Sequence, residues 1–186
     1  PISRFRNLVR TSTIVAQSQW DTVLPAEILE EFCNLVIEAE RIGDFRYPRT
    51  MHIANPEVRL YDLMCFSDAG EKGKTGVMYT YNNRTLSFSG GKTILPHRAH
   101  SIAKGELDAA YQVSLMVEGL HRHLAPHAGT KYLFLDATIA IHWIANSEHP
   151  LHVFQRIRVM QIVKSFTDEK GVLQVYHVRR DHNPAE

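Results

Sequence analysis

The sequence predicts an α/β fold in which a mixed five-stranded sheet is flanked by helices, with a helical connecting segment in front. Short apolar runs typical of strands occur between segments that have the 3.6-residue apolar spacing of helices. The order of these segments along the chain is β-β-β-α-β-α-α-β. The 186-residue chain, 44 % apolar and 22 % charged, has the composition of a globular protein that can form a core.

Residues 1–58 are predicted to form a separate connecting segment, made of a helix and an extended linker. The helix begins near Pro25 and continues to Arg41, with glutamates in its first turns, where the helix dipole favours negative charge. Gly43 ends the helix, and the two prolines that follow favour an extended chain. Because the chain begins with Pro1 rather than Met, we expect it to be part of a longer polypeptide.

Residues 59–186 are predicted to form the α/β domain itself. Short turns join its first three strands, so we expect these strands to form an antiparallel meander. A long amphipathic helix then separates them from the last two strands. The expected strands are residues 61–67, 77–83, 85–91, 131–136 and 172–178, and the expected helices are residues 103–123, 137–147 and 151–166.

The chain contains two cysteines, Cys33 and Cys65, each within an apolar stretch. Two isolated cysteines provide neither a disulfide framework nor a zinc motif, so we expect buried, reduced thiols in a cytoplasmic protein. No apolar run approaches the roughly 20 residues that span a bilayer. No basic segment followed by an apolar one opens the chain, so we expect neither secretion nor a membrane partner.

The net charge of +1 does not indicate a nucleic-acid partner, but the distribution of the charges does. Residues 72–105 contain no aspartate or glutamate, while they contain six lysines and arginines and two histidines. A local basic surface can bind phosphates even when acids elsewhere balance the total charge. The candidates for phosphate contacts are Lys92, Arg98 and Lys104, and the alternative is a solvated basic surface.

Three carboxylates occupy unusual positions in the predicted elements. Asp68 follows the first strand and Asp136 follows the fourth, so both emerge at one edge of the sheet if these strands are adjacent and parallel. Glu106 lies four residues before Ala110 and therefore continues the apolar face of the long helix, where an uncompensated charge is costly. Asp108 is about 200° further around the helix and is expected to face water.

A divalent cation would compensate the mutual repulsion of these three carboxylates. A ligand set of oxygen atoms, without His or Cys, favours Mg²⁺ or Mn²⁺ over Zn²⁺. Two such ions about 3.5–4 Å apart activate a water and stabilise the leaving oxygen of a phosphodiester. The alternative is that Asp68 and Asp136 are ordinary strand-end residues, with Asp136 capping the helix that begins near Thr138.

Five segments, in their order and at their spacing, form a specific pattern. They are WDTVLPAEILEEF with the later YPRTM, FSDAGEKGKTGVMY, GGKTILPHRAHSIAKGELDAA, FLDATIAIHWI and YHVRRDHNPAE. This pattern resembles the ribonuclease H region of BEL/Pao-type retrotransposon polyproteins, including the connecting segment before it. The resemblance covers nearly the whole chain.

The resemblance implies an RNase H-like fold, two Mg²⁺ ions that Mn²⁺ can replace, and cleavage of the RNA strand of RNA–DNA hybrids during reverse transcription. It implies that Asp68, Glu106 and Asp136 bind the metal ions and that Glu186 occupies the fourth position, where the family usually has aspartate. It also implies a reverse transcriptase domain in the same polyprotein and a location in the cytoplasm, within a virus-like particle. We expect the domain's C-terminal helix to lie beyond residue 186.

Four histidines and one tryptophan are further candidates for a role in the site or in the core. His177, in the last strand, is expected to orient a residue or help product leave, or else to be a core histidine. Trp143 is expected to belong to the core rather than to stack on a base. Three histidines lie at the end of the long helix and just after it. They match no zinc motif, and we expect a solvated helix end: His121, His123 and His127.

Two alternative functions compete with ribonuclease H activity. The domain can be a structural module of a retroelement polymerase that has lost catalysis, or another nuclease on the same fold, such as an integrase-like enzyme. Retention of Asp68, Glu106 and Asp136 argues against lost catalysis. The meander before the long helix and the NPAE ending fit ribonuclease H better than an integrase.

Overall fold

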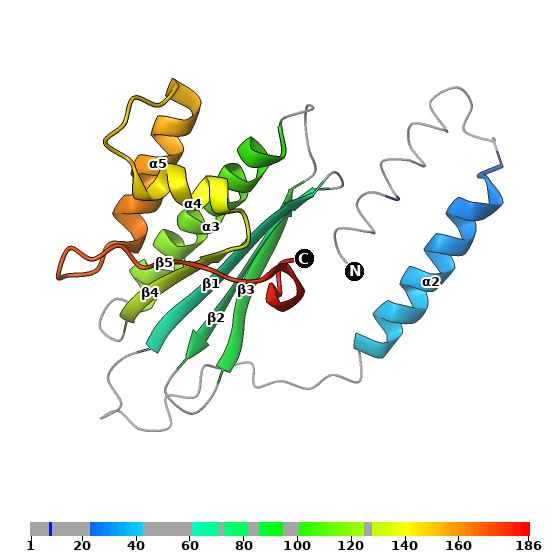
Figure 1. Ribbon diagram of the computed structural model, residues 1–186. Helices are drawn as coiled ribbons and strands as arrows, with labels where there is room; N and C mark the ends of the chain where they lie inside the picture. Colours follow the sequence, from blue (N-terminus) through cyan, green and yellow to red (C-terminus); the bar gives the residue numbers. More distant parts are fainter. Residues whose placement is uncertain are drawn as a thin grey trace. The chain divides into compact units, whose positions relative to one another are not determined.

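The structure, a computed structural model, describes residue 8 and residues 23–42, 61–70, 73–81, 86–94, 101–124 and 128–186 (Figure 1). The chain divides into two units, Pro1–His52 and Ile53–Glu186, and each is described by itself. The boundary predicted at residue 58 lies outside the described residues and stays a prediction. None of the helices in the described ranges is long and apolar enough to cross a membrane.

Helix α2, Ala26–Ile42, is the main described element of the first unit. It begins directly after Pro25, as predicted, and the carbonyl oxygen of Pro25 accepts hydrogen bonds from N–H groups of the first turn. Leu35 is buried, whereas Cys33 is exposed, so the prediction of a buried Cys33 thiol is wrong. The reason is that Cys33 lies about 200° around the helix from Leu35.

The second unit is built on a mixed sheet of five strands in the order β3-β2-β1-β4-β5. β2 pairs antiparallel with β1 and with β3, whereas β4 pairs parallel with β1 and with β5. This arrangement confirms the predicted mixed sheet and its antiparallel meander. The strands are β1 (Tyr61–Gly70), β2 (Gly73–Tyr81), β3 (Leu86–Ile94), β4 (Ala128–Leu135) and β5 (Val175–His177).

The strands differ in length from the prediction, and two of the differences have a clear cause. The pairing of β1 with β2 continues to the end of their hairpin, so Asp68 lies within β1, opposite Thr75, rather than after the strand. β5 is shorter than expected because the residues before it turn back onto the preceding helix, where the N–H of Gln174 bonds the carbonyl of Phe166.

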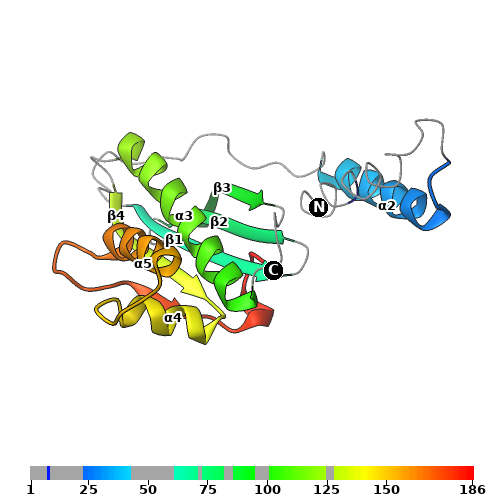
Figure 2. The ribbon, with the colours of Figure 1, turned by 90° about the horizontal axis from the view of Figure 1, so that it is seen from above.

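Three helices form a layer on one face of the sheet (Figures 1 and 2). α3 packs across β1 and β2, α5 packs beside α3 and against β4, and α4 contacts both of these helices. Their positions agree with the predicted helices to within a few residues. The helices are α3 (Ile102–Leu124), α4 (Thr138–Ala145) and α5 (Val153–Phe166).

The core lies between this helical layer and the sheet. Alternate residues of β1 are buried and face the helices, while the residues between them are only partly buried. Cys65 is a buried free thiol, as predicted, and its burial raises the pKa of the thiol. The largest members of the core cluster are Leu63, Leu107, Val113, Val117, Leu133, Leu135, Ile144, Val159, Ile162 and Phe166.

β2 approaches α3 closely at Gly76. A Cβ atom at this position would overlap the side chain of Val113, which lies on the buried stripe of α3. The absence of a side chain at Gly76 therefore allows α3, which carries Glu106, to pack close to the sheet.

Asp108 is buried between the sheet and α5, so the prediction that it faces water is wrong. Its carboxylate accepts hydrogen bonds from Lys74 on β2 and from Arg158 on α5, and the residue is only 8 % exposed. Burial opposes ionisation, but the bonds from the two cations hold the pKa of Asp108 below its usual value. Because α5 covers a second face of α3, this face is buried too, and ion pairs compensate its charge.

The other face of the sheet carries a row of aromatic rings. Phe66 and Phe134, which are paired across β1 and β4, stack with their ring centroids 4.9 Å apart. The row continues through edge-to-face or tilted contacts to strands on both sides, and such pairs add to the stability of strand pairing. In the order of the sheet the rings belong to Phe88, Tyr79, Phe66, Phe134 and Tyr176.

Candidate metal centre

The two aspartates of the predicted site lie next to each other because β1 and β4 are adjacent and parallel. Ser67 on β1 is paired with Leu135 on β4, and Asp68 and Asp136 are the residues that follow them. Both carboxylates therefore lie at the edge where the parallel strands have their carboxyl ends. The condition for the predicted convergence, that these two strands are adjacent and parallel, is therefore met.

Glu106 approaches the same edge from the first turns of α3. It is only 5 % exposed and lies on the face of the helix that continues through the buried residues Ala110, Val113 and Val117. The spacing argument that placed Glu106 on the packed face of the helix is therefore confirmed. Asp108 is buried as well, so burial does not distinguish Glu106 from Asp108 as the argument expected.

The structure brings Asp68, Glu106 and Asp136 together. Each offers one carboxylate oxygen, and these three atoms all lie within 4.8 Å of one another. No other group of three or more acids, histidines or cysteines in the described ranges has this arrangement.

Burial and the neighbouring negative charges both disfavour ionisation of the carboxyl groups in the cluster. Burial raises the pKa of Glu106 to about 8, and the charges of Asp68 and Asp136 contribute to the rise. Burial also raises the pKa of Asp68, with further contributions from Asp136 and from Glu186. Without a bound cation, the cluster therefore holds a proton at neutral pH.

The cluster has the properties expected of a divalent cation site. Oε2 of Glu106 and Oδ1 of Asp136 are buried and have no hydrogen-bond partner, although buried polar atoms are normally satisfied. A cation would satisfy both atoms and remove the repulsion. Because all the donors are carboxylate oxygens, the residues fit Mg²⁺ or Mn²⁺.

The alternative role of Asp136 as a helix cap is not adopted. The N-cap position of α4 is Ala137, and no side chain forms a cap hydrogen bond there. Asp136 is therefore available to the carboxylate cluster, and the strand-end interpretation leaves its buried oxygen unexplained.

Glu186 lies near the cluster but is not part of it. Its carboxylate accepts a hydrogen bond from Nε of Arg180 at 2.8 Å, and both side chains are largely exposed. Its charge contributes to the raised pKa of Asp68, while the charge of Arg180 acts in the opposite direction on Asp68 and Glu106. Glu186 is thus a neighbour of the three carboxylates that is paired with a cation of the protein itself.

Asn183 is a residue near the site whose contribution the sequence reasoning missed. It is 6 % exposed, and its Nδ2 donates a hydrogen bond to the carbonyl oxygen of Ser67, immediately before Asp68. The available signal was an asparagine within the NPAE segment, three residues before a candidate carboxylate. Its partner on β1 is distant in sequence and could not be identified from the pattern.

The predicted phosphate-binding residues lie partly within the described structure. Lys92 is exposed on β3, where its amine donates to Oε1 of Gln112 on α3, and Lys104 is exposed near the start of α3, two residues before Glu106. Arg98 lies outside the described residues. Lys74, from the same basic stretch, is bound to Asp108 and stabilises the fold.

His177 and Trp143 occupy different environments. His177 is exposed and is paired with Leu135, the residue before Asp136, so it lies beside the end of β4 rather than in the core. Trp143 is partly buried and packs against the core, as predicted.

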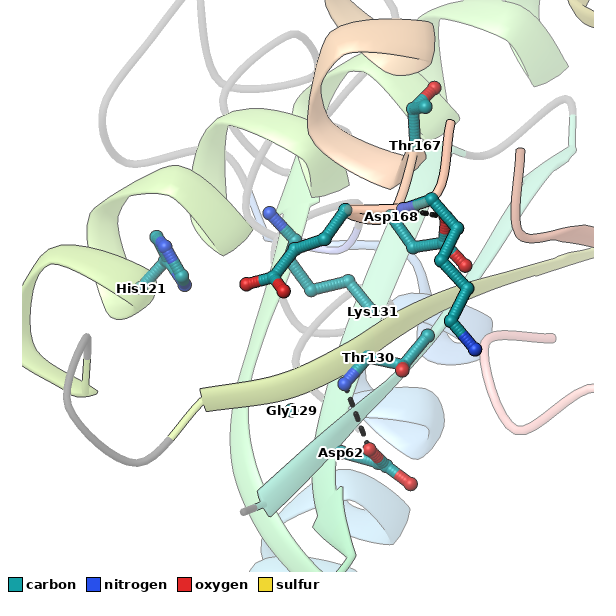
Figure 3. A pocket seen from close by; sticks show the side chains of 9 residues that line it. Asp62, His121, Gly129, Thr130, Lys131, Thr167 and Asp168 are labelled. Atoms are coloured by element: carbon teal, nitrogen blue, oxygen red, sulfur yellow. Dashed lines mark hydrogen bonds between the residues drawn. The ribbon is translucent and has the colours of Figure 1, made fainter. Parts of the chain in front are cut away.

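A separate cavity of about 460 Å³ lies at the opposite end of the parallel strands (Figure 3). It is lined by residues of mixed charge, and Asp62 at the start of β1 accepts a hydrogen bond there from the N–H of Thr130 at 2.9 Å. His121 lines this cavity and is half-buried, so it is less exposed than the predicted solvated helix end implies. His123 is exposed as predicted, and His127 lies outside the described residues.

Comparison with protein families shows the family to which this chain is similar. Residues 3–137 match the family model of the "Pao retrotransposon-like RNaseH-like domain". The matched region is well over half of the chain and ends one residue after Asp136, so it contains all three clustered carboxylates. A search of the curated proteins found no match.

Solved structures with a similar arrangement include three with RNase H domains or reverse transcriptase in their descriptions. The N-terminal RNase H domain of a Mycobacterium tuberculosis protein, fused to maltose-binding protein, has a TM-score of 0.49 at 13 % identity, over 66 % of this chain and 86 % of that chain. RNase H1 of Halobacterium salinarum has a TM-score of 0.45 at 16 % identity, over 68 % of this chain and 90 % of that chain. A foamy viral protease-reverse transcriptase in complex with an RNA/DNA hybrid has a TM-score of 0.40 at 10 % identity, over 73 % of this chain and 19 % of that chain.

Proposed function

Because the chain belongs to the family of Pao retrotransposon-like RNaseH-like domains, we propose that it is a metal-dependent ribonuclease H. The proposed reaction is cleavage of the RNA strand of RNA–DNA hybrids during reverse transcription of a retroelement. The observation that carries the proposal is the convergence of Asp68, Glu106 and Asp136 within 4.8 Å, two of them with unsatisfied buried oxygens.

The carboxylates of the cluster would hold Mg²⁺ or Mn²⁺, with Glu186 as a fourth ligand from the C-terminal turn. Bound in this way, two such ions would supply a nucleophile at neutral pH and neutralise charge that develops on the phosphodiester. Glu106 is buried on its side of the cluster, and the β1–β4 pairing fixes Asp68 relative to Asp136.

Recognition of the hybrid is assigned to residues around the cluster. Lys92 and Lys104 are exposed on β3 and α3, and they would contact backbone phosphates, together with Arg98. Discrimination between RNA and DNA would depend on contacts to 2′-hydroxyl groups, which only the RNA strand carries. His177, exposed beside Leu135, is proposed to act near the departing product.

We also infer that the domain acts beside a reverse transcriptase in the same polyprotein, in the cytoplasm and within a virus-like particle. The retrotransposon description of the matching family supports this context. Residues 1–58 would then be the connecting segment and residues 59–186 the nuclease domain.

The test is hydrolysis of an end-labelled RNA–DNA hybrid with Mg²⁺, Mn²⁺ or EDTA. We expect cleavage of the RNA strand only with a divalent cation, and its loss in the Asp68→Asn variant with an unchanged circular dichroism spectrum. Asp62→Asn is the matched control, because Asp62 lies on the same strand at the end away from the cluster. Cleavage by Asp68→Asn at the wild-type rate would contradict the proposal.

A substrate panel separates the alternatives. Cleavage of duplex DNA instead of the hybrid would favour an integrase-like nuclease. A folded protein that binds Mn²⁺ weakly and cuts no substrate would favour a structural module of a retroelement polymerase.

A further inference from the structure

The turn that carries Glu186 is fastened to the sheet by one buried amide. After the short 3₁₀ helix Arg180–His182, the side chain of Asn183 enters the protein and is only 6 % exposed. Its Nδ2 donates to the carbonyl oxygen of Ser67 at 3.0 Å, and its Oδ1 accepts from the N–H of Ala185 at 3.1 Å. Ala185 is also buried, so the two residues anchor the turn together.

The anchoring point lies directly beside the metal-binding edge. Ser67 precedes Asp68 on β1 and is paired with Leu135, which precedes Asp136 on β4. The carbonyl oxygen of Asn183 in turn accepts a hydrogen bond from the N–H of Glu186 at 3.2 Å. One residue thus contacts both the strand that carries Asp68 and the backbone of Glu186.

The side chain of Glu186 is held much less firmly than its backbone. It is paired with Arg180, and the side chains of the two residues are 46 % and 76 % exposed. Exposed pairs of this kind contribute little to stability. The carboxylate can therefore leave Arg180 for a cation without a large loss, while Asn183 keeps the backbone in place.

We propose that Asn183 is a positioning residue of the metal centre: it holds the Arg180–Glu186 turn on β1, so that Glu186 lies within reach of cations bound by Asp68, Glu106 and Asp136. This inference rests on the proposed function. It assigns to Asn183 an effect on metal binding that passes through Glu186, in addition to any effect on stability.

The test measures Mn²⁺ binding by isothermal titration calorimetry, without nucleic acid, in a double-mutant cycle of Asn183→Ala and Glu186→Gln. We expect each single variant to weaken Mn²⁺ binding about 10- to 100-fold, the usual effect of residues that support metal ligands. The double variant should bind no more weakly than Glu186→Gln alone, because Asn183 acts through Glu186.

Asn146→Ala is the matched control. Nδ2 of Asn146 likewise donates to a backbone carbonyl, that of His142 at the end of α4, away from the turn. We expect this variant to bind Mn²⁺ like the wild type. If Asn183→Ala does not fold, Asn183→Asp takes its place, because its carboxylate can accept from Ala185 but cannot donate to Ser67.

The outcomes separate this inference from the proposed function. Wild-type Mn²⁺ affinity in the folded Asn183 variant overturns the role of Asn183, as does an equal loss with and without Glu186→Gln. If Asp68→Asn loses Mn²⁺ binding and cleavage while the Asn183 variant keeps both, only the role of Asn183 fails. If Asp68→Asn keeps both, the proposed function fails.

Discussion

Replacing Glu106 by glutamine should change how the metal-free protein responds to pH. The pKa of Glu106 rises from the usual 4.5 to about 8 in the folded protein, because the carboxyl group is buried beside Asp68 and Asp136. Between these two pH values the folded protein binds one more proton than the unfolded chain. Its stability should therefore fall as the pH rises through this range, and most of the loss should be complete above pH 8.

The size of the effect follows from the pKa. One pKa unit corresponds to about 1.4 kcal/mol, so a group with a pKa of about 8 loses about 3 kcal/mol of its stabilisation between pH 6 and pH 9. Glu106→Gln carries no titrating group at this position and should lack this part of the pH dependence. Charge repulsion at pH 9 should also be smaller in the variant, which is expected to be the more stable protein there.

The assay is urea denaturation in EDTA at pH 6 and pH 9, followed by circular dichroism. Glu118→Gln is the matched control, because Glu118 lies on the same helix and its pKa is lowered by a hydrogen bond from Gln161, outside this pH range. Adding Mg²⁺ at pH 9 to 100 times its dissociation constant should restore about 2.7 kcal/mol to the wild type. Equal pH dependence in the wild type and Glu106→Gln would refute the reasoning.

Three further predictions concern packing and binding. Asp108→Ala leaves the partly buried cations Lys74 and Arg158 without this partner and should lower the free energy of unfolding by about 3–5 kcal/mol in urea denaturation. Asp181→Ala removes the exposed ion pair with Arg179 and should lower the free energy of unfolding by no more than about 1 kcal/mol. An equal loss of stability in Asp108→Ala and Asp181→Ala would contradict the argument. Gly76→Ala places a Cβ atom against the side chain of Val113 and should lower the free energy of unfolding by about 1–3 kcal/mol. An unchanged melting temperature would show that α3 can shift to make room for the Cβ atom. Lys92→Ala with Lys104→Ala should reduce the slope of log affinity for a hybrid against log salt by about 2, and an unchanged slope would remove both residues from the interface.

Much of the candidate site could be predicted because its residues follow local patterns. Asp68 and Asp136 each end an apolar run, and the parallel pairing of those runs brings the two residues level. Glu106 continues the apolar stripe of α3, so helix geometry alone places it on the packed face. These positions depend on the periodicity of single elements and on one strand pairing.

The errors concern residues whose environment is set by distant parts of the chain. Asp108 is buried because α5 packs on a second face of α3 and supplies Arg158, which the periodicity of α3 cannot reveal. Asn183 bonds a carbonyl group on β1, at the other end of the domain's sequence. The exception is Cys33, whose exposure follows from local helix geometry: it lies in an apolar stretch but on the side of α2 opposite the buried Leu35.

The stacked rings of Phe66 and Phe134 have a consequence for the alignment of the two central strands. These residues are paired across β1 and β4, and each lies two positions before the aspartate of its strand. A slip of one residue would move Asp136 about 3.3 Å along β1 and would turn alternate side chains of β4 to the wrong face. The same slip would break the ring stack. The aromatic pair thus helps to fix the register of β1 and β4, and through it the spacing of Asp68 and Asp136.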